Sequence, residues 1–401
     1  MNVSSEAHRS ERGQVLVIVA VGLVAMIAML GLIVDGGYAW GKQRDTQNGT
    51  DASAEAGAVV LAERLAGVTK TDADVWTSVQ ATAVANGLPD SGPAVTPGTD
   101  CSGGAPATKI GVCGYYTDID GTMISGAAAV GAGSIPSGAS GVAAFGRTRF
   151  DTFLMQIVGF NTVPITVDAT AVAGYVEEAC PASSGCAVLP VTFPVSIVTC
   201  DGSGDAVLEA NSYTKNTATP YVIPLCKNNA GNVGWLDWTS PYGGKSELAD
   251  SIENPNNPGI PVPTWLQVAE TGNVNSAPVE DALRTWDGAV VLIPQFDGTC
   301  KVAPTGTGLG GCSDPGGSGS NQWYHLPQFA AFQFCGGTPN WCTGYEFGSY
   351  VNGTNKAVCD TGNGATSCLV GRFIDFITNT TVTSNVGANS NTGLVGVQLI
   401  D

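Results

Sequence analysis

Residues Leu32–Ala58 read LIVDGGYAWGKQRDTQNGTDASAEAGA, and this stretch decides how the chain begins. An apolar run ends at Asp35, yet the polar and then alanine-rich residues that follow keep the composition of a helix. Upstream, Val15 to Val34 carries no charge over a length that spans a bilayer core as a helix. The sequence therefore predicts a transmembrane helix that continues beyond the membrane surface.

A cleaved secretory signal peptide is the alternative interpretation of this apolar run. The apolar region of a signal peptide is about 7 to 15 residues long and is followed by a small-x-small cleavage site. The run Val15 to Val34 is longer and is followed by Asp-Gly-Gly-Tyr. These two differences favour an uncleaved anchor.

Beyond the anchor, small apolar residues recur at the three-and-four spacing of one helical face. Ala52, Ala56 and Val59 belong to this face. Because small side chains let helix backbones approach closely, we expect them to pack against neighbouring helices.

The chain as a whole is predicted to be an α+β protein with four regions. Thr71 or Asp72 caps a short helix, and the strand-like segment VPITVDATAVAGYV begins at Val163. A boundary near Cys180 introduces short β-type runs between loops rich in Gly, Pro, Asn and Ser, which predicts an all-β domain. The expected regions are a cytoplasmic N-terminus (1–13), a transmembrane helix that continues beyond the membrane (14–66), a small α+β domain (67–179) and a β-rich, disulfide-stapled extracellular domain (180–401).

All twelve cysteines lie at or beyond Cys101, and their number is even. Cysteines in this number favour an oxidising compartment, so the long C-terminal part is predicted to be outside the cell and the first dozen residues in the cytoplasm. The absence of C-x-x-C spacing argues against zinc ribbons and thioredoxin-type sites. Loop composition favours bonds between sequential cysteines: Cys101 with Cys113, Cys180 with Cys186, Cys200 with Cys226, Cys300 with Cys312, Cys335 with Cys342, and Cys359 with Cys368.

The formal net charge is −18, and the first 45 residues contribute nothing to it because their charges balance. A surface without a basic patch repels nucleic acid and anionic lipid, so no nucleic-acid partner is expected.

Catalysis has few candidate residues. His325 is the one histidine beyond the apolar run, and no serine stands in a G-x-S-x-G motif. We therefore predict a plain strand residue at His325, and a membrane-anchored extracellular enzyme is kept as an alternative function.

Two further patterns suggest ligand binding without completing a motif. The first pattern resembles the start of a calcium-binding loop and consists of Asp201, Ser203, Asp205 and Glu209. A calcium-binding loop requires an acidic residue at the position of Ser212, so an Asx-type turn is the competing interpretation. No cofactor other than calcium is expected. A sugar-binding face could be built from tryptophans, which more often fill a core. The six considered are Trp235, Trp238, Trp265, Trp286, Trp323 and Trp341.

The segment from Arg12 to Ala58 closely resembles the N-terminus of TadE/TadG-like Flp (Tad) pilus assembly proteins. The shared features are an Arg-Gly-Gln lead-in, an apolar helix, Val-Asp-Gly-Gly, an aromatic residue and Thr-Asp-Ala-Ser-Ala. RFDTFLMQIVGFNTVPITVDATAVAGYV is similar to a helix-plus-strand segment of these proteins, and GNVGWLDW, YHLPQFAAFQF and GRFIDFI are similar to later TadG-type blocks.

The resemblance implies a membrane-anchored, pilin-like protein of a tight-adherence pilus, either a minor or tip pilin or a protein that acts in pilus assembly. Its implied partners are other pilins and Tad assembly proteins through the N-terminal helix, and the membrane. A host or surface glycan is a further expected partner. Type IV prepilins carry an acid five residues after the processed glycine, and counting from Gly13 that position is Ile18, so peptidase processing is not assumed. An envelope module that binds sugar or calcium stays open as an alternative.

Overall fold

The computed structural model describes residues 7–88, 96–101, 104–106, 109–124, 128–179, 181–184, 187–201, 203, 205–226, 234–236, 238, 245–270, 277–316, 322–336, 340–342, 365–383 and 391–400. The chain forms two compact units. The first comprises residues 1–60, 71–172 and 399–401, and the second comprises 61–70 and 173–398.

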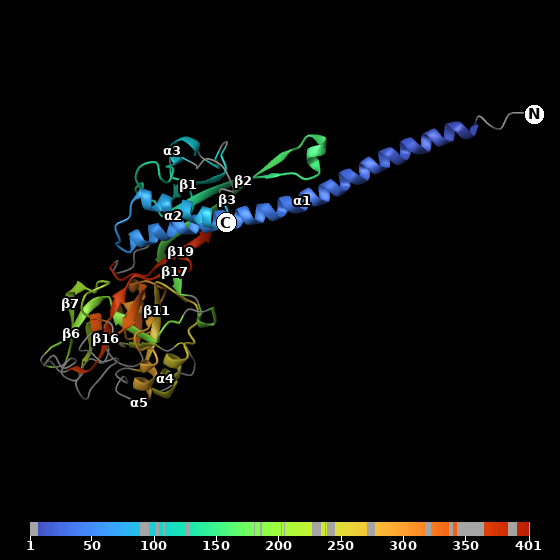
Figure 1. The fold of residues 1–401 in the computed structure, drawn as a ribbon. Coiled ribbons are helices and arrows are strands. Elements are labelled where there is room, and N and C mark those ends of the chain that lie inside the picture. The colour runs from blue at the N-terminus through green and yellow to red at the C-terminus, as the bar shows by residue number, and fades with distance from the viewer. Residues whose placement is uncertain are drawn as a thin grey trace, which may run out of the picture. The chain divides into compact units, whose positions relative to one another are not determined.

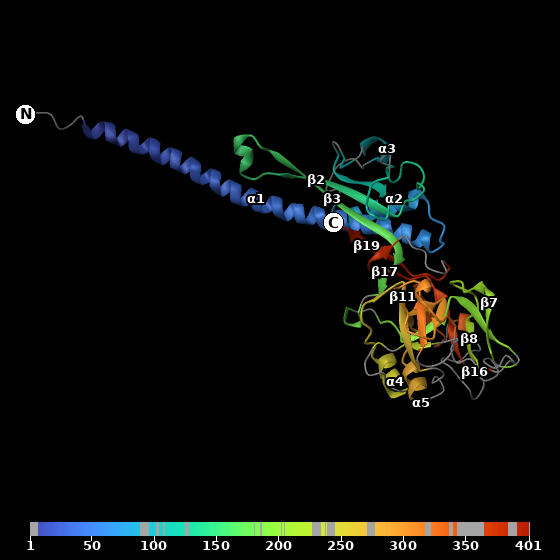
Figure 2. The ribbon, with the colours of Figure 1, turned by 180° about the vertical axis from the view of Figure 1, so that it is seen from behind.

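Helix α1 (Ala7–Leu65) is continuous over 59 residues, which confirms that the helix extends past the apolar run. The glycines at 36, 37 and 41 do not interrupt it, because helical neighbours on both sides hold the backbone. The apolar run is long and apolar enough to cross a membrane, and its side chains are exposed. Figures 1 and 2 show α1 as an extended rod in blue.

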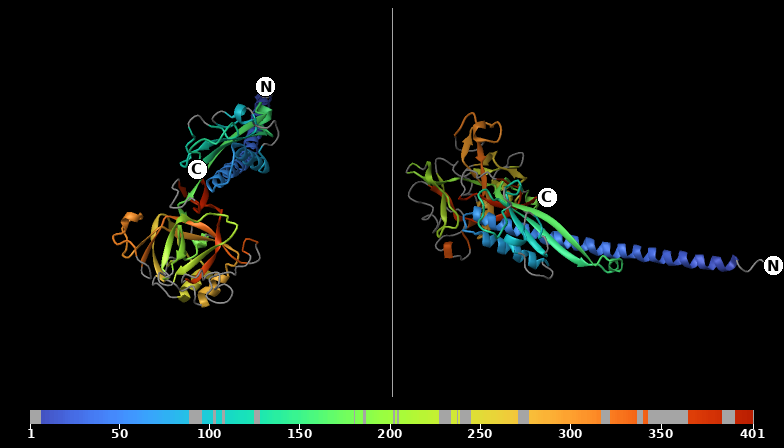
Figure 3. Two further views of the ribbon diagram at one scale, coloured as in Figure 1. Left: turned by 90° about the vertical axis from the view of Figure 1, so that its left-hand side faces the viewer. Right: turned by 90° about the horizontal axis from the view of Figure 1, so that it is seen from above.

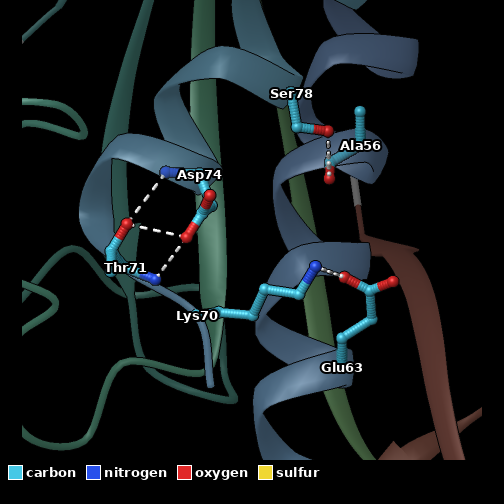
Figure 4. Close-up of polar contacts among 6 residues, drawn as sticks. All are labelled: Ala56, Glu63, Lys70, Thr71, Asp74 and Ser78. Atoms are coloured by element: carbon cyan, nitrogen blue, oxygen red, sulfur yellow. Dashed lines mark hydrogen bonds and ion pairs between the residues drawn. The ribbon is translucent and has the colours of Figure 1, made fainter. Parts of the chain in front are cut away.

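Helix α2 (Asp72–Ala85) begins with a capping box. Thr71 Oγ1 accepts a hydrogen bond from the Asp74 amide at 3.3 Å, and the Asp74 carboxylate accepts one from the Thr71 amide at 2.7 Å (Figure 4). Just before the cap, Lys70 forms an ion pair with Glu63 at 2.6 Å. The predicted start of this helix at Thr71 or Asp72 is therefore confirmed. A short helix α3 (Pro97–Asp100) follows.

The first unit contains the antiparallel strands β1 (Gly111–Thr117), β2 (Gly141–Asp151) and β3 (Thr162–Val176), of which β3 continues into the second unit. Strands β2 and β3 form a long hairpin from the Gly141–Val172 pair to the Asp151–Thr162 pair. The short 3-10 helix η1 (Met155–Val158) lies in its tip. Figure 3 shows this hairpin in green running alongside α1.

The resemblance implied a helix followed by a strand over RFDTFLMQIVGFNTVPITVDATAVAGYV. The strand is β3, but only Met155–Val158 (η1) of the implied helix is helical. Its first residues belong to β2, where Thr148 and Phe150 are buried and Arg149 and Asp151 are exposed. This alternation has the period of a strand, and pairing with β3 stabilises it against the helical alternative.

The second unit is built on a nine-stranded sheet with the order β13-β14-β11-β9-β5-β12-β15-β16-β8. Its strands are β5 (Val191–Pro194), β8 (Tyr221–Cys226), β9 (Gly234–Leu236), β11 (Thr264–Glu270), β12 (Val290–Phe296), β13 (Gly298–Cys300), β14 (Gln322–Leu326), β15 (Gln328–Phe334) and β16 (Ala365–Ile374). Further strands and short helices are β4 (Glu178–Ala179), η2 (Ala182–Ser184), β6 (Ser196–Cys200), β7 (Ala206–Ser212), β10 (Ile260–Pro261), η5 (Leu309–Gly311), η6 (Asn340–Cys342), β17 (Ile377–Asn379), β18 (Val382–Thr383) and β19 (Val395–Ile400), whose last residues belong to the first unit.

Two helices accompany this sheet, α4 (Lys245–Glu253) and α5 (Ala277–Arg284), so the region after residue 180 is rich in sheet and not purely β. Leu248, Ala249 and Ile252 of α4 enter the large core cluster at helical spacing. Short loop-bounded segments of this kind carry too few turns for their period to stand out in a sequence.

Disulfide bonds close three short loops among the described side chains: Cys101–Cys113, Cys300–Cys312 and Cys335–Cys342. Cys200 and Cys368 are also disulfide-bonded. Cys180, Cys186 and Cys359 lie outside the described residues, as does the side chain of Cys226. These three bonds join neighbours in the sequence, as expected where each loop is rich in Gly, Pro or Ser.

We predict that the remaining cysteines also pair in sequence order. Peptide mapping of the non-reduced full chain should recover Cys180–Cys186, Cys200–Cys226 and Cys359–Cys368, because each pair encloses a turn-rich loop. The three bonds described above serve as internal controls in the same digest. A peptide that joins Cys200 to Cys359 would contradict the prediction.

Candidate functional site

One side of helix α1 is buried against the first unit's sheet through small and hydroxylated residues. Thr46, Thr50, Ser53 and Gly57 recur at helical spacing and are buried. Thr46 Oγ1 and Thr148 Oγ1 of β2 are 2.7 Å apart, within hydrogen-bond distance. The hydroxyls of Thr46, Thr50 and Ser53 also donate to carbonyl oxygens one turn earlier, so no buried hydroxyl on this side lacks a partner.

Glycines bring the helix and the hairpin into close contact. A Cβ atom on Gly57 would lie 2.9 Å from methyl groups of both Val79 and Val142, and one on Gly146 of β2 would lie 2.1 Å from Thr50 Oγ1. Because neither position has room for a side chain, the separation between α1 and β2 depends on both glycines.

The other side of the helix carries Ala52, Ala56 and Val59, the residues predicted to pack against neighbouring helices. The two alanines are half-buried and Val59 is 36% exposed. The main-chain oxygen of Ala56 accepts a hydrogen bond from Ser78 Oγ of α2 at 3.0 Å, so α2 lies along one edge of this stripe (Figure 4). Part of each side chain remains accessible to another molecule.

Asp35 stands where the apolar run ends, and it joins α1 to the tip of the β2–β3 hairpin. Its carboxylate accepts hydrogen bonds from three consecutive main-chain N–H groups, those of Phe153 (2.7 Å), Leu154 (3.0 Å) and Met155 (2.7 Å). Met155 is the first residue of η1, and Phe153 and Leu154 directly precede it, so these three N–H groups have no partner within the helical turn. The side chain of Asp35 therefore caps a helical turn that lies 118 residues later in the sequence.

The electrostatic environment keeps Asp35 ionised. Loss of hydration raises the pKa of the Asp35 carboxyl group, but the N–H groups of Met155, Phe153 and Leu154 lower it by more, so its pKa lies below the usual carboxyl value. The hydrogen bonds are thus charge-assisted at neutral pH.

His325 lies in strand β14, as predicted. Its side chain is 5% exposed, and Nδ1 is hydrogen-bonded to Asp297 while Nε2 lies 3.0 Å from the main-chain oxygen of Thr307. In a catalytic triad Nε2 would instead face a nucleophilic hydroxyl. The contacts of His325 tie the loop after β13 to the sheet.

Of the four residues considered for calcium, Asp201, Ser203 and Asp205 form a tight turn at the β6–β7 connection, and Glu209 lies in β7. Asp201 Oδ1 accepts hydrogen bonds from the amides of Ser203 (2.9 Å) and Asp205 (2.8 Å), and Glu209 accepts one from the Thr199 hydroxyl at 3.0 Å. This is the geometry of the Asx-type turn. Within the described parts of the chain there is no group of three or more His, Cys, Asp or Glu side chains placed to hold a metal ion.

The tryptophans considered for sugar binding do not gather on one face. Trp235 and Trp286 pack in the largest core cluster, Trp238 packs against a second cluster, and Trp341 packs against a third beneath Arg372. Trp265 and Trp323 are buried or half-buried.

A cavity of about 310 Å³ lies within the second unit, near the C-terminal end of β3. Its lining includes Tyr175, Val262, Gln328 and Leu394 and contains no charged side chain. Burial raises the pKa of Tyr175, so its hydroxyl is neutral at physiological pH. A pocket of this composition offers neither a base nor a nucleophile activated by one.

The partnership of Asp35 with the hairpin tip is the feature that sequence reasoning missed. The sequence shows Asp35 as the residue that ends the apolar run. Its three hydrogen-bond donors are main-chain N–H groups, and no pattern of side chains in the sequence indicates them. The same holds for Gly146, whose contact with Thr50 depends on tertiary packing.

Comparison with known proteins places the similarity on this same helix. Residues 13–60 match the model of the Tad family, described as Flp pilus-assembly TadE/G-like. No curated protein and no solved structure matches the chain. The matched segment contains the apolar run, Asp35 and both sides of α1 described above.

Proposed function

We propose that this protein is a membrane-anchored structural component of a Flp (Tad) pilus, a minor or tip pilin whose C-terminal part is displayed outside the cell. One observation carries the proposal: the family match at residues 13–60 falls on a single unbroken helix that joins an exposed apolar run to the packed first unit. A helix of this kind serves both as an anchor and as a surface for assembly.

The disulfide bonds support an extracytoplasmic location for the rest of the chain. Eight of the cysteines are in disulfide bonds in the described part of the structure. Such bonds persist in oxidising compartments and are rare in the cytosol. The proposed topology places residues 1–13 in the cytoplasm, the apolar run Val15–Val34 in the membrane and the residues beyond about Tyr38 outside.

The proposed division of labour follows the four predicted regions. Residues 14–66 anchor the protein and contact other pilus subunits, and residues 67–179 pack against helix α1. Residues 180–401 form the domain exposed outside the cell, which would bind a host or surface glycan or another pilus subunit. The proposal assigns no catalytic activity, and the contacts of His325 with Asp297 and Thr307 favour this over an anchored enzyme.

Replacing both Ala52 and Ala56 with leucine should abolish most incorporation of the protein into pili. Bulky side chains on this stripe would force neighbouring helices apart, whereas the second unit should fold normally because it does not contain these residues. Pili sheared from the cell surface would be probed for the protein, with its total amount in whole cells measured in parallel.

Ala81→Leu with Ala85→Leu provides the matched control, since these alanines are also four residues apart on a helix and are exposed on α2. The control should assemble as the wild type does. Normal incorporation of the Ala52/Ala56 variant would remove this stripe from the proposed assembly surface.

A further inference from the structure

The tip of the β2–β3 hairpin lies against the apolar run of α1, not against its polar continuation. Leu154, Met155 and Ile157 from the tip line a groove of about 260 Å³ together with four residues of the helix. Those four are Val24, Ile27, Ala28 and Gly31. All four lie within the uncharged stretch Val15–Val34.

The position of this contact along the helix determines how deep in the bilayer the hairpin tip would lie. Val24 is ten residues before Val34, which corresponds to about 15 Å along a helix, or about half of the hydrocarbon thickness of a bilayer. If the run Val15–Val34 spans the membrane, the tip lies at the level of the acyl chains in the leaflet nearer to Asp35. Tyr38 and Trp40, both exposed, follow on the polar side at the level where aromatic residues favour the membrane interface.

The outward surface of the tip is apolar. Phe153, Ile157 and Phe160 are 70%, 71% and 59% exposed. No charged residue occurs between Asp151 and Asp168. Large apolar side chains that are this exposed and this close together mark a site of interaction, and here their surface is continuous with that of the apolar helix.

The backbone of the tip is suited to surroundings without water. The N–H groups of Ile157, Gly159 and Phe160 donate to carbonyl oxygens within the tip, at 3.0 to 3.2 Å. The main-chain N–H groups of Phe153, Leu154 and Met155 donate to Asp35. The side-chain amide of Gln156 donates to the Phe153 main-chain oxygen at 2.9 Å. Because unpaired polar groups are costly in a bilayer, a loop enters lipid only when its hydrogen bonds are made internally or within the protein.

We propose that this tip, residues 152–161, is a second membrane contact that inserts Phe153, Ile157 and Phe160 into the acyl chains of the leaflet nearer to Asp35, beside the helix. Continuity with the apolar surface of α1 and the internal hydrogen bonding of the tip favour lipid as the occupant of this surface. A two-point attachment limits rotation of the first unit about the axis of α1. The inference rests on the membrane anchoring in the proposed function.

Photo-cross-linking of the full chain in phosphatidylcholine vesicles tests the inference. Phe160→p-benzoylphenylalanine places a photoreactive ketone at the tip, and Ile157→p-benzoylphenylalanine provides a second position in case the first variant folds poorly. We expect a phospholipid adduct on the peptide that contains the probe, detected by mass spectrometry. Leu208→p-benzoylphenylalanine is the matched control, because Leu208 of β7 is 58% exposed and the second unit is not expected to enter lipid, so it should give no adduct.

A probe at Leu23, in the middle of the apolar run, separates this inference from the proposed anchoring. An adduct at Leu23 without one at Phe160 and Ile157 would overturn the inference and leave the anchor intact. Loss of adducts at all three positions would overturn both. Cross-links from the tip to a second copy of the chain in place of lipid would also overturn the inference and identify the surface as an interface between subunits.

Discussion

Asp35→Ala should release the hairpin tip from helix α1 and raise the hydrogen-exchange rates of the Phe153, Leu154 and Met155 amides by on the order of tenfold or more. The substitution removes the one acceptor that serves all three N–H groups and leaves them without partners beside the apolar run. The measurement is hydrogen exchange with mass spectrometry on the full chain in vesicles, followed on the peptide that contains η1.

Two variants sharpen this test. Asp35→Asn keeps one carbonyl oxygen as an acceptor and loses the charge, so its effect should fall between that of alanine and the wild type. Asp45→Ala removes an exposed acid from the same helix and should leave exchange at the tip unchanged. Unchanged exchange in Asp35→Ala would mean that packing of Leu154 and Met155 holds the tip without the carboxylate.

Gly57→Leu should destabilise the first unit by about 2 to 3 kcal/mol. Leucine favours a helix over glycine by up to about 1 kcal/mol, but the new side chain would overlap the methyl groups of Val79 and Val142. Both neighbours are β-branched and stiff, so they cannot turn aside. Native-state hydrogen exchange of the β1 and β2 amides reports this free energy without requiring the second unit to unfold.

Gly41→Leu is the matched control in the same helix, because nothing lies within 4 Å of a Cβ atom at that position. It should leave stability unchanged or raise it slightly, through helix propensity alone. If the two variants lowered stability equally, the effect would come from leucine in this helix and not from the close contact at Gly57.

Helix α1 illustrates what a sequence can reveal about this protein. The uncharged run, the small residues at Ala52 and Ala56 and the family resemblance all lie within one continuous segment, and each is a local signal. The cap at Thr71 is local as well, because its partner Asp74 is three residues away. Such features are predictable because the residues that interact are neighbours in the chain.

The hairpin shows where local signals fail. The family resemblance implied a helix from Arg149 onward, but Arg147–Asp151 pairs with Thr162–Thr166 and is a strand. In the second unit, α4 and α5 were missed because helices of 9 and 8 residues give a weak periodic signal between loops. The buried contacts of His325 with Asp297 and Thr307 likewise depend on sheet pairing between β13 and β14.

The short disulfide loops also determine how the chain would behave under load. The three described bonds join cysteines 12, 12 and 7 positions apart. A residue contributes about 3.5 Å to a fully stretched chain, so each longer loop withholds about 40 Å and the shorter one about 25 Å. Tension along the chain could therefore unravel the surrounding strands but could not draw out these three segments. If the protein is anchored and displayed as proposed, its greatest extension under tension would be shorter by the combined length of these segments.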